Sequence, residues 1–183
     1  MPRAQVLTAL NSGALIVDYN GHGAEQQWSF SDLFDGNDAA VLTNGGHLPV
    51  YLLMDCLNGL FQDVYAEALA KSLILAPNGG AVAVWASSGF TQQTPQASME
   101  LALLNEFSAH PAEMLGLMVL HAKSGTSDND VRRTWILFGD PAMKLRISAA
   151  APPPVSPAPP RPPVPINPPR VCPHGVSCIL EKQ

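Results

Sequence analysis

Two uninterrupted apolar runs, each as long as a β-strand and each ending in a turn of small residues, constrain the fold of this chain most strongly. The first run covers residues 14–17 and leads into the turn 19–23, and the second covers residues 50–54 and leads into the turn 55–59. Apolar residues that are continuous instead of alternating indicate strands buried on both faces, as in a parallel sheet. We therefore expect two neighbouring parallel strands, each followed by a turn.

Helical patterns separate the strand-like segments. We expect further strands near residues 81–85 and 134–138, and helices near residues 3–10, 60–75, 94–107 and 111–123. This alternation is typical of the α/β class, in which helices cover both faces of a mostly parallel sheet. Adjacent parallel strands lie about 4.8 Å apart, and ligands of such sheets bind beyond the carboxyl ends of the strands. His22 and Cys56, which follow consecutive strands, are therefore expected to meet there.

His22 and Cys56 form a candidate catalytic dyad. A thiol with an ordinary pKa of about 8.5 is mostly protonated at neutral pH, so a nucleophilic cysteine needs a neighbouring base. A histidine can take the thiol proton and later protonate a departing amine. The backbone N–H groups of Gly23 and Cys56 are candidate oxyanion-hole donors. A small buried cysteine and a surface histidine in a turn are the alternatives that these residues leave open.

Four further residues are candidates for binding a substrate. Ser87, Ser88 and Gly89 follow the third expected strand at its carboxyl end, and Trp28 is a candidate wall. A large aromatic side chain such as Trp28 is also typical of a packed core.

Two aspartates and three histidines are weaker candidates. Asp18 and Asp55 have the chemistry to orient His22, but side chains that are neighbours in sequence point to opposite faces of a strand. His47 precedes the second strand at its amino end, and His110 and His121 lie on helical stretches. We expect all three histidines to lie outside the site.

Charge and hydropathy exclude several classes of partner. The net charge is −5 and no cluster of Lys and Arg occurs, so we expect no nucleic acid partner. The longest apolar runs are too short to span a membrane. The proposed chemistry needs no metal and no cofactor.

The composition changes sharply after Ile147. We expect a folded domain over residues 1–148 and a proline-rich, largely disordered tail over residues 149–183. Cys172, His174 and Cys178 in that tail supply at most three metal ligands, and a disulfide between the two cysteines is the alternative for an exported protein.

Over about residues 1–147 the chain resembles the gingipain-type cysteine peptidases of the caspase-haemoglobinase fold. Five motifs carry the resemblance: Tyr19-Asn20-Gly21-His22-Gly23, Asp55-Cys56-Leu57-Asn58-Gly59, Ala66-Glu67-Ala68, Gly80-Ala81-Val82-Ala83 leading to Ala86-Ser87-Ser88, and Phe138-Gly139-Asp140-Pro141. The resemblance implies a caspase-like three-layer sandwich and an endopeptidase that acts on protein or peptide substrates through an acyl-enzyme. It assigns catalysis to His22 and Cys56, and an architectural role to Glu67 and residues 139–141.

In that family further strands precede the strand that carries the histidine. We therefore expect a partial domain that lacks its first strands, with an exposed apolar edge, and a chain that is insoluble or inactive when made alone. The alternative is a truncated or inactive peptidase-like domain that acts as a binding module on a Pro-rich linker. The visible N-terminus carries no signal peptide, whereas the resemblance implies secretion or the cell surface, so the compartment stays open.

Overall fold

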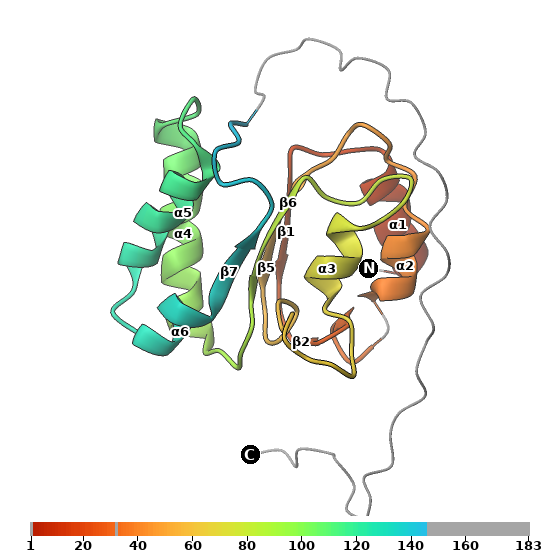
Figure 1. The fold of residues 1–183 in the computed structure, drawn as a ribbon, viewed down its shortest axis with the longest axis horizontal. Helices are drawn as coiled ribbons and strands as arrows, with labels where there is room; N and C mark the ends of the chain where they lie inside the picture. Colours follow the sequence, from red (N-terminus) through yellow and green to blue (C-terminus); the bar gives the residue numbers. More distant parts are fainter. Residues whose placement is uncertain (1, 32, 146–183) are drawn as a thin grey trace, which may run out of the picture.

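A four-stranded sheet lies at the centre of the computed structural model, which describes residues 2–31 and 33–145 (Figure 1). The expected tail, with Cys172 and Cys178, lies outside these residues. The sheet has the order β1 (Ile16–Asn20), β5 (Val50–Met54), β6 (Ala83–Ser87) and β7 (Trp135–Phe138). The first three strands are parallel and β7 is antiparallel to β6. The expected mostly parallel sheet is therefore confirmed.

The antiparallel direction of β7 has a simple origin. Helix α6 (Asn129–Thr134) joins β7 without a loop, at the end of the sheet where Trp135 pairs with Ser87. The chain therefore enters β7 from the carboxyl ends of the other strands and runs back along β6.

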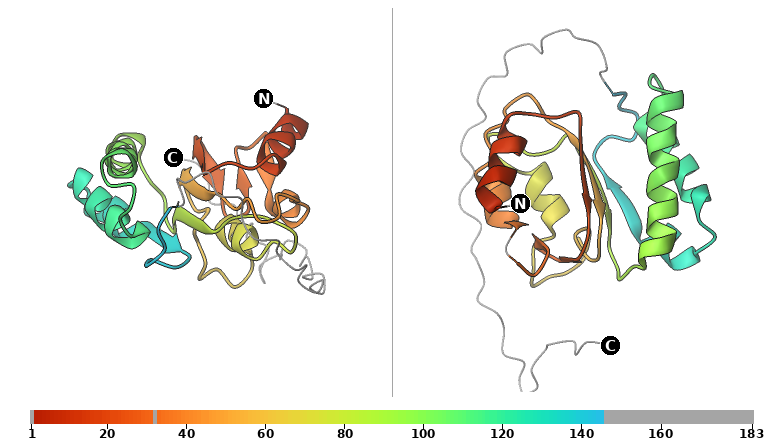
Figure 2. Two further views of the ribbon diagram at one scale, coloured as in Figure 1. Left: turned by 90° about the horizontal axis from the view of Figure 1, so that it is seen from above. Right: turned by 180° about the vertical axis from the view of Figure 1, so that it is seen from behind.

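Helices cover both faces of the sheet and make a three-layer sandwich, as the resemblance implies (Figures 1 and 2). One face carries α1 (Arg3–Asn11), α2 (Gly36–Ala40) and α3 (Leu69–Ile74), and the other carries α4 (Gln93–Ala109), α5 (Leu115–Ala122) and the 3-10 turn η1 (Lys123–Gly125). Strand β5 is buried throughout. Its Tyr51 and Leu53 belong to the first core cluster, while Leu52 and Met54 belong to the second. Continuous apolar sequence in β5 thus reflects helices on both sides.

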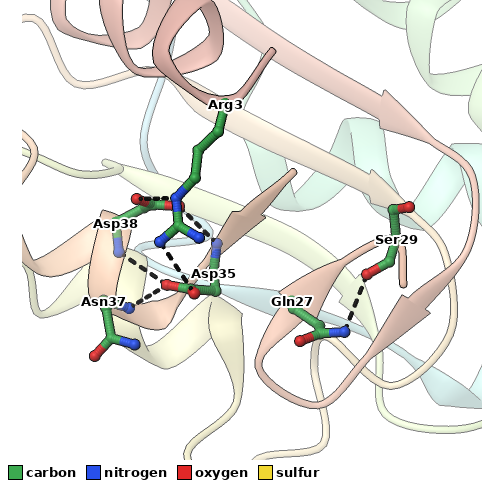
Figure 3. A network of polar contacts seen from close by, with 6 residues as sticks. All are labelled: Arg3, Gln27, Ser29, Asp35, Asn37 and Asp38. Carbon is green, nitrogen blue, oxygen red and sulfur yellow. Dashed lines mark hydrogen bonds and ion pairs between the residues drawn. The ribbon is translucent and has the colours of Figure 1, made fainter. Parts of the chain in front are cut away.

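A small antiparallel sheet follows β1 and was not predicted. It consists of β2 (Gly23–Ala24), β3 (Gln27–Trp28) and β4 (Phe34–Asp35). Asp35 begins α2 with a capping box shared with Asp38. Arg3 of α1 contacts both carboxylates, at 3.2 Å from Asp35 and 2.9 Å from Asp38 (Figure 3). These contacts tie α1 to the small sheet that carries the histidine turn.

The helix expected over residues 60–75 begins only at Leu69, so its first half was predicted wrongly. Just before this segment the N–H of Leu57 donates to Gly89 and that of Gly59 to Ser87, and the apolar side chains of Phe61, Val64 and Tyr65 are exposed instead of packed on the core. The first N–H groups of α3, from Leu69 and Ala70, donate to the carbonyls of Glu25 and Asn58. Tertiary hydrogen bonds therefore override the helical spacing of the apolar residues.

Across the described residues, no helix is both long and apolar enough to cross a membrane.

Candidate active site

Strand register aligns the turn that carries His22 with the turn that carries Cys56. Asn20 pairs with Met54 at the ends of β1 and β5, and the N–H of Gly21 donates to the Met54 carbonyl at 3.2 Å. His22 and Cys56 each lie two residues beyond that pair. The next residue, Gly23, packs so closely that a Cβ there would lie on the Asp55 carboxyl and 2.7 Å from the Cys56 carbonyl oxygen. The two turns are therefore in direct backbone contact.

Asn58 joins the same two turns from the other side. Its side chain is fully buried, and its amide donates to the carbonyls of Ala24 and Gln27 in the small antiparallel sheet. The Asn58 carbonyl in turn accepts from Ala70 of α3. The residue two places after the cysteine thus anchors both the histidine turn and a helix.

Cys56 is half-buried, and its side chain faces the loop that follows β6. Its Sγ lies 3.8 Å from the carbonyl oxygen of Thr91. The next residue, Leu57, has a φ of 68° and donates its N–H to Gly89. A left-handed backbone is costly for leucine, and such strain is concentrated at functional sites. Ser29, with a φ of 61°, is the other described non-glycine residue in this region of φ, and its N–H donates to His22.

His22 is exposed, and its backbone is held more firmly than its ring. The His22 carbonyl accepts from the Tyr19 hydroxyl and from the N–H of Ser29, both at 2.7 Å. The ring lies against Phe30, with centroids 5.9 Å apart. No hydrogen bond within the described part of the chain joins the His22 ring to Cys56. The fold therefore brings the two residues together through their backbones.

Two backbone N–H groups near the dyad make no hydrogen bond to a neighbouring strand. Because Ser29 donates to His22, Gly23 and Trp28 form a non-hydrogen-bonded pair, which leaves the Gly23 N–H outside the β2–β3 ladder. The Cys56 N–H also lacks an acceptor among residues 2–31 and 33–145. Both groups are the ones that sequence reasoning selected as oxyanion-hole donors.

The four substrate-binding candidates occupy different environments. Gly89 lies beside the cysteine turn, through its bond to Leu57. Ser87 belongs to β6, is fully buried, and donates to the Gly89 carbonyl at 3.0 Å, while Ser88 donates to Thr134 at 3.0 Å. Trp28 is 4% exposed and stacks on Tyr19 with centroids 4.5 Å apart. The side chains of Ser87 and Trp28 therefore pack inside the fold, where they support the loops around the dyad.

Asp55 is the most unusual residue of the site. Its side chain is fully buried beside Gly23, and neither carboxyl oxygen has a hydrogen-bond partner among the described residues. Burial raises the pKa of Asp55 to about 9. The carboxyl is therefore protonated and neutral at physiological pH.

Three polar residues that sequence reasoning did not combine lie between β1 and α4. The Asn20 amide donates to Glu100 Oε2 at 2.9 Å. Burial, together with the neighbouring Asp18 carboxyl, raises the pKa of Glu100 to about 7. Asp18 thus faces Glu100 on α4. A glutamate one place after buried Met99, among the residues that α4 buries, was the available signal for this contact.

The remaining candidates have structural partners. His121 lies 3.4 Å from Glu106, and Glu67 lies 2.9 Å from Lys71. His47 packs beside Gly13, ahead of β5 and at its amino end. Within the described residues, no group of three or more His, Cys, Asp or Glu side chains is placed to hold a metal ion.

Comparison with known proteins identifies relatives of this arrangement. The sequence model of peptidase family C25 matches residues 2–146. Gingipain R2 of Porphyromonas gingivalis is 29% identical over 155 residues, which covers 77% of this chain and 21% of that protein. Gingipain R1 of the same species is also 29% identical, over 15% of its length. The chain thus spans about a fifth or less of these relatives.

Solved structures agree with the sequence comparison. The crystal structure of the Arg-specific cysteine proteinase gingipain R superimposes with a TM-score of 0.69 and 26% identity, over 80% of this chain and 37% of that one. The complex of the pro- and mature domains of Porphyromonas gingivalis RgpB gives a TM-score of 0.71 at 23% identity and supports the fold.

Proposed function

The chain belongs to peptidase family C25, and from this premise we propose that it supplies the catalytic dyad, His22 and Cys56, of a cysteine endopeptidase. The observation that carries the proposal is the close packing of Gly23 against the Asp55 carboxyl and the Cys56 carbonyl oxygen, with the two turns side by side at the carboxyl ends of β1 and β5. In parallel sheets this is the place where ligands bind.

The reaction follows from the chemistry of the two side chains. The His22 ring takes the proton of the Cys56 thiol, and the thiolate attacks the carbonyl carbon of the scissile peptide bond. The N–H groups of Gly23 and Cys56 stabilise the negative oxygen that forms. When the C–N bond breaks, the proton on His22 passes to the departing amine and leaves a thioester on Cys56. Water then attacks the thioester, gives a proton through His22 to the sulfur, and releases the acid.

The exposed position of the His22 ring fits this role. Rotation about its side-chain bonds carries the ring from Phe30 towards the cysteine without moving the anchored backbone. Catalytic hydrogen bonds are often long or absent until substrate binds. We propose that substrate is protein or peptide, and that the loop 87–91 lines one side of the site through Gly89 and Thr91. The family match does not favour a non-catalytic binding module.

The test is cleavage of a fluorogenic peptide mixture in which the residue before the scissile bond is varied. It is applied to the 183-residue chain. We expect Cys56→Ala to abolish cleavage and His22→Ala to lower kcat by about 10²–10⁴-fold, the range for a general acid–base. His110→Ala, at the exposed carboxyl end of α4, serves as the control. Cleavage by Cys56→Ala at the parent rate would refute the proposal.

A further inference from the structure

The fold around Asp55 offers no partner that explains why an aspartate is buried at this position. A buried polar group without a partner is expensive, and buried carboxyls are normally paired. Asp55 is fully buried with both oxygens unpartnered among the described residues. An asparagine or an apolar residue of similar size would fill the same space at lower cost. Such an exception beside a candidate nucleophile points to a role in the chemistry.

The surroundings of Asp55 connect it to both halves of the dyad. It directly precedes Cys56 in sequence, and its carboxyl fills the space beneath Gly23, the residue after His22. Gly23 is also a proposed oxyanion donor. A movement of the Asp55 carboxyl is therefore expected to shift Cys56, the histidine turn and the Gly23 N–H together.

We propose that Asp55 is a positioning residue whose buried carboxyl supports the His22 turn against Cys56, and that a negative charge on this carboxyl switches the site off. The inference rests on the proposed function of the dyad. A neutral carboxyl packs beneath Gly23 as a spacer of fixed size. A carboxylate places a negative charge beside the two groups that become negative during the reaction, the Cys56 sulfur and the oxyanion at the Gly23 N–H. A like charge in the same site disfavours the charged form of its neighbour.

The titratable groups that face Asp55 come from β1 and from the two turns. From β1, the Tyr19 ring is the titratable neighbour, and burial first, then the Asp55 charge, raises the pKa of Tyr19. The Tyr19 hydroxyl is already committed to the His22 carbonyl. His22 and Cys56 are the other titratable groups of the two turns. No Lys or Arg forms an ion pair with Asp55 in the described part of the chain, so nothing there offsets its charge.

Linkage gives the switch a second, independent signature. The pKa of Asp55 lies at about 9 in the folded chain, against 3.8 for an ordinary aspartate. Between these values the folded state holds a proton that the unfolded state has lost. The contribution of Asp55 to the free energy of unfolding is therefore greatest below pH 4, and it falls as the pH rises towards 9.

The experiment compares the parent chain with Asp55→Asn, which keeps the shape and cannot ionise. Cys172 and Cys178 are replaced by serine in every variant. The rate of Cys56 alkylation by iodoacetamide is measured from pH 6 to 10.5, and the melting temperature from pH 5 to 9. Near pH 9 we expect Asp55→Asn to react about two- to threefold faster than the parent, because a like charge worth one pKa unit changes the thiolate fraction by about that factor when the pH is close to the ordinary thiol pKa of about 8.5. We also expect its melting temperature to fall less with rising pH. Asp130→Asn, an exposed aspartate on α6, is the matched control and should follow the parent in both measurements.

A second variant separates support from charge. Asp55→Ala removes the spacer, so we expect it to lower the peptide-cleavage rate more than Asp55→Asn does. Identical alkylation profiles and identical melting curves for the parent and Asp55→Asn would overturn the inference, and they would leave the dyad untouched. Retained cleavage by Cys56→Ala would instead refute the proposed function, whereas the melting curves would still report the protonation of Asp55.

Discussion

At the scale of single residues, the contact between the two turns depends on the missing side chain of Gly23. A Cβ at this position would overlap the Asp55 carboxyl and lie 2.7 Å from the Cys56 carbonyl oxygen, closer than side chains normally approach. The carbonyl belongs to the backbone and cannot rotate away. Glycine is therefore needed here because of close approach.

Gly23→Ala should separate the histidine turn from the cysteine turn. We expect it to lower the free energy of unfolding by about 1–3 kcal/mol, the usual cost of overpacking, and to reduce peptide cleavage. Gly36→Ala, at the start of α2, is the control, because its added Cβ would meet only Ser72, with the hydroxyl oxygen at 3.2 Å. Its effect should stay below about 1 kcal/mol. Urea unfolding measures both variants, and equal stabilities would contradict the close packing described for Gly23.

At the scale of elements, the two edges of the sheet differ. The Lys123 ammonium donates at 2.7 Å to the Trp135 carbonyl on the outer side of β7, so a charged side chain occupies that edge. On β1, the bonds of Leu15 and Gly21 to β5 mean that the N–H and C=O groups of Ile16, Asp18 and Asn20 point away from the sheet. An apolar groove of about 360 Å³ between α1 and β1 lies beside this edge. An open edge next to apolar surface favours strand pairing with another chain.

The 183-residue chain made alone should therefore self-associate through β1. Leu15→Lys places a charge at the start of that edge on a side chain that is 46% exposed, and it should lower the associated fraction. Val41→Lys, on a side chain that is 61% exposed at the end of α2, should have no such effect. Sedimentation velocity at several concentrations measures both, and a parent chain that stays monomeric would contradict the prediction.

Continuous apolar runs in the sequence predicted β1 and β5, although β1 is only partly buried and β5 is buried throughout, and periodicity missed the elements that tertiary contacts create. The apolar runs of β1 and β5 located both strands, and with them the strand-end positions of His22 and Cys56. The early half of the expected helix over 60–75 failed because the chain after Cys56 is bonded to Ser87 and Gly89, and the apolar side chains of Phe61, Val64 and Tyr65 find no core to pack against. The small sheet β2–β4 has strands of only two residues, too short for a period to appear. The Asp55 environment depends on packing between separate segments, which no local pattern reports.

At the scale of the whole molecule, the chain is a three-layer α/β sandwich that covers 37% of the gingipain R chain it superimposes on. Everything proposed for catalysis lies at one end of the sheet, on the turns after β1 and β5 and the loop after β6. The open β1 edge and its groove lie beside the histidine turn, through Tyr19 and Trp28. We therefore expect a strand that pairs along β1 to steady the site.

The most direct test of the dyad is to map where a peptide-based electrophile attaches. The chain is treated with a mixture of peptidyl acyloxymethyl ketones and digested, and the adduct is located by mass spectrometry. The account predicts one modified residue, Cys56, with labelling lost in Cys56→Ala and strongly slowed in His22→Ala. Labelling that spreads equally over Cys56, Cys172 and Cys178, or that does not depend on His22, would contradict it.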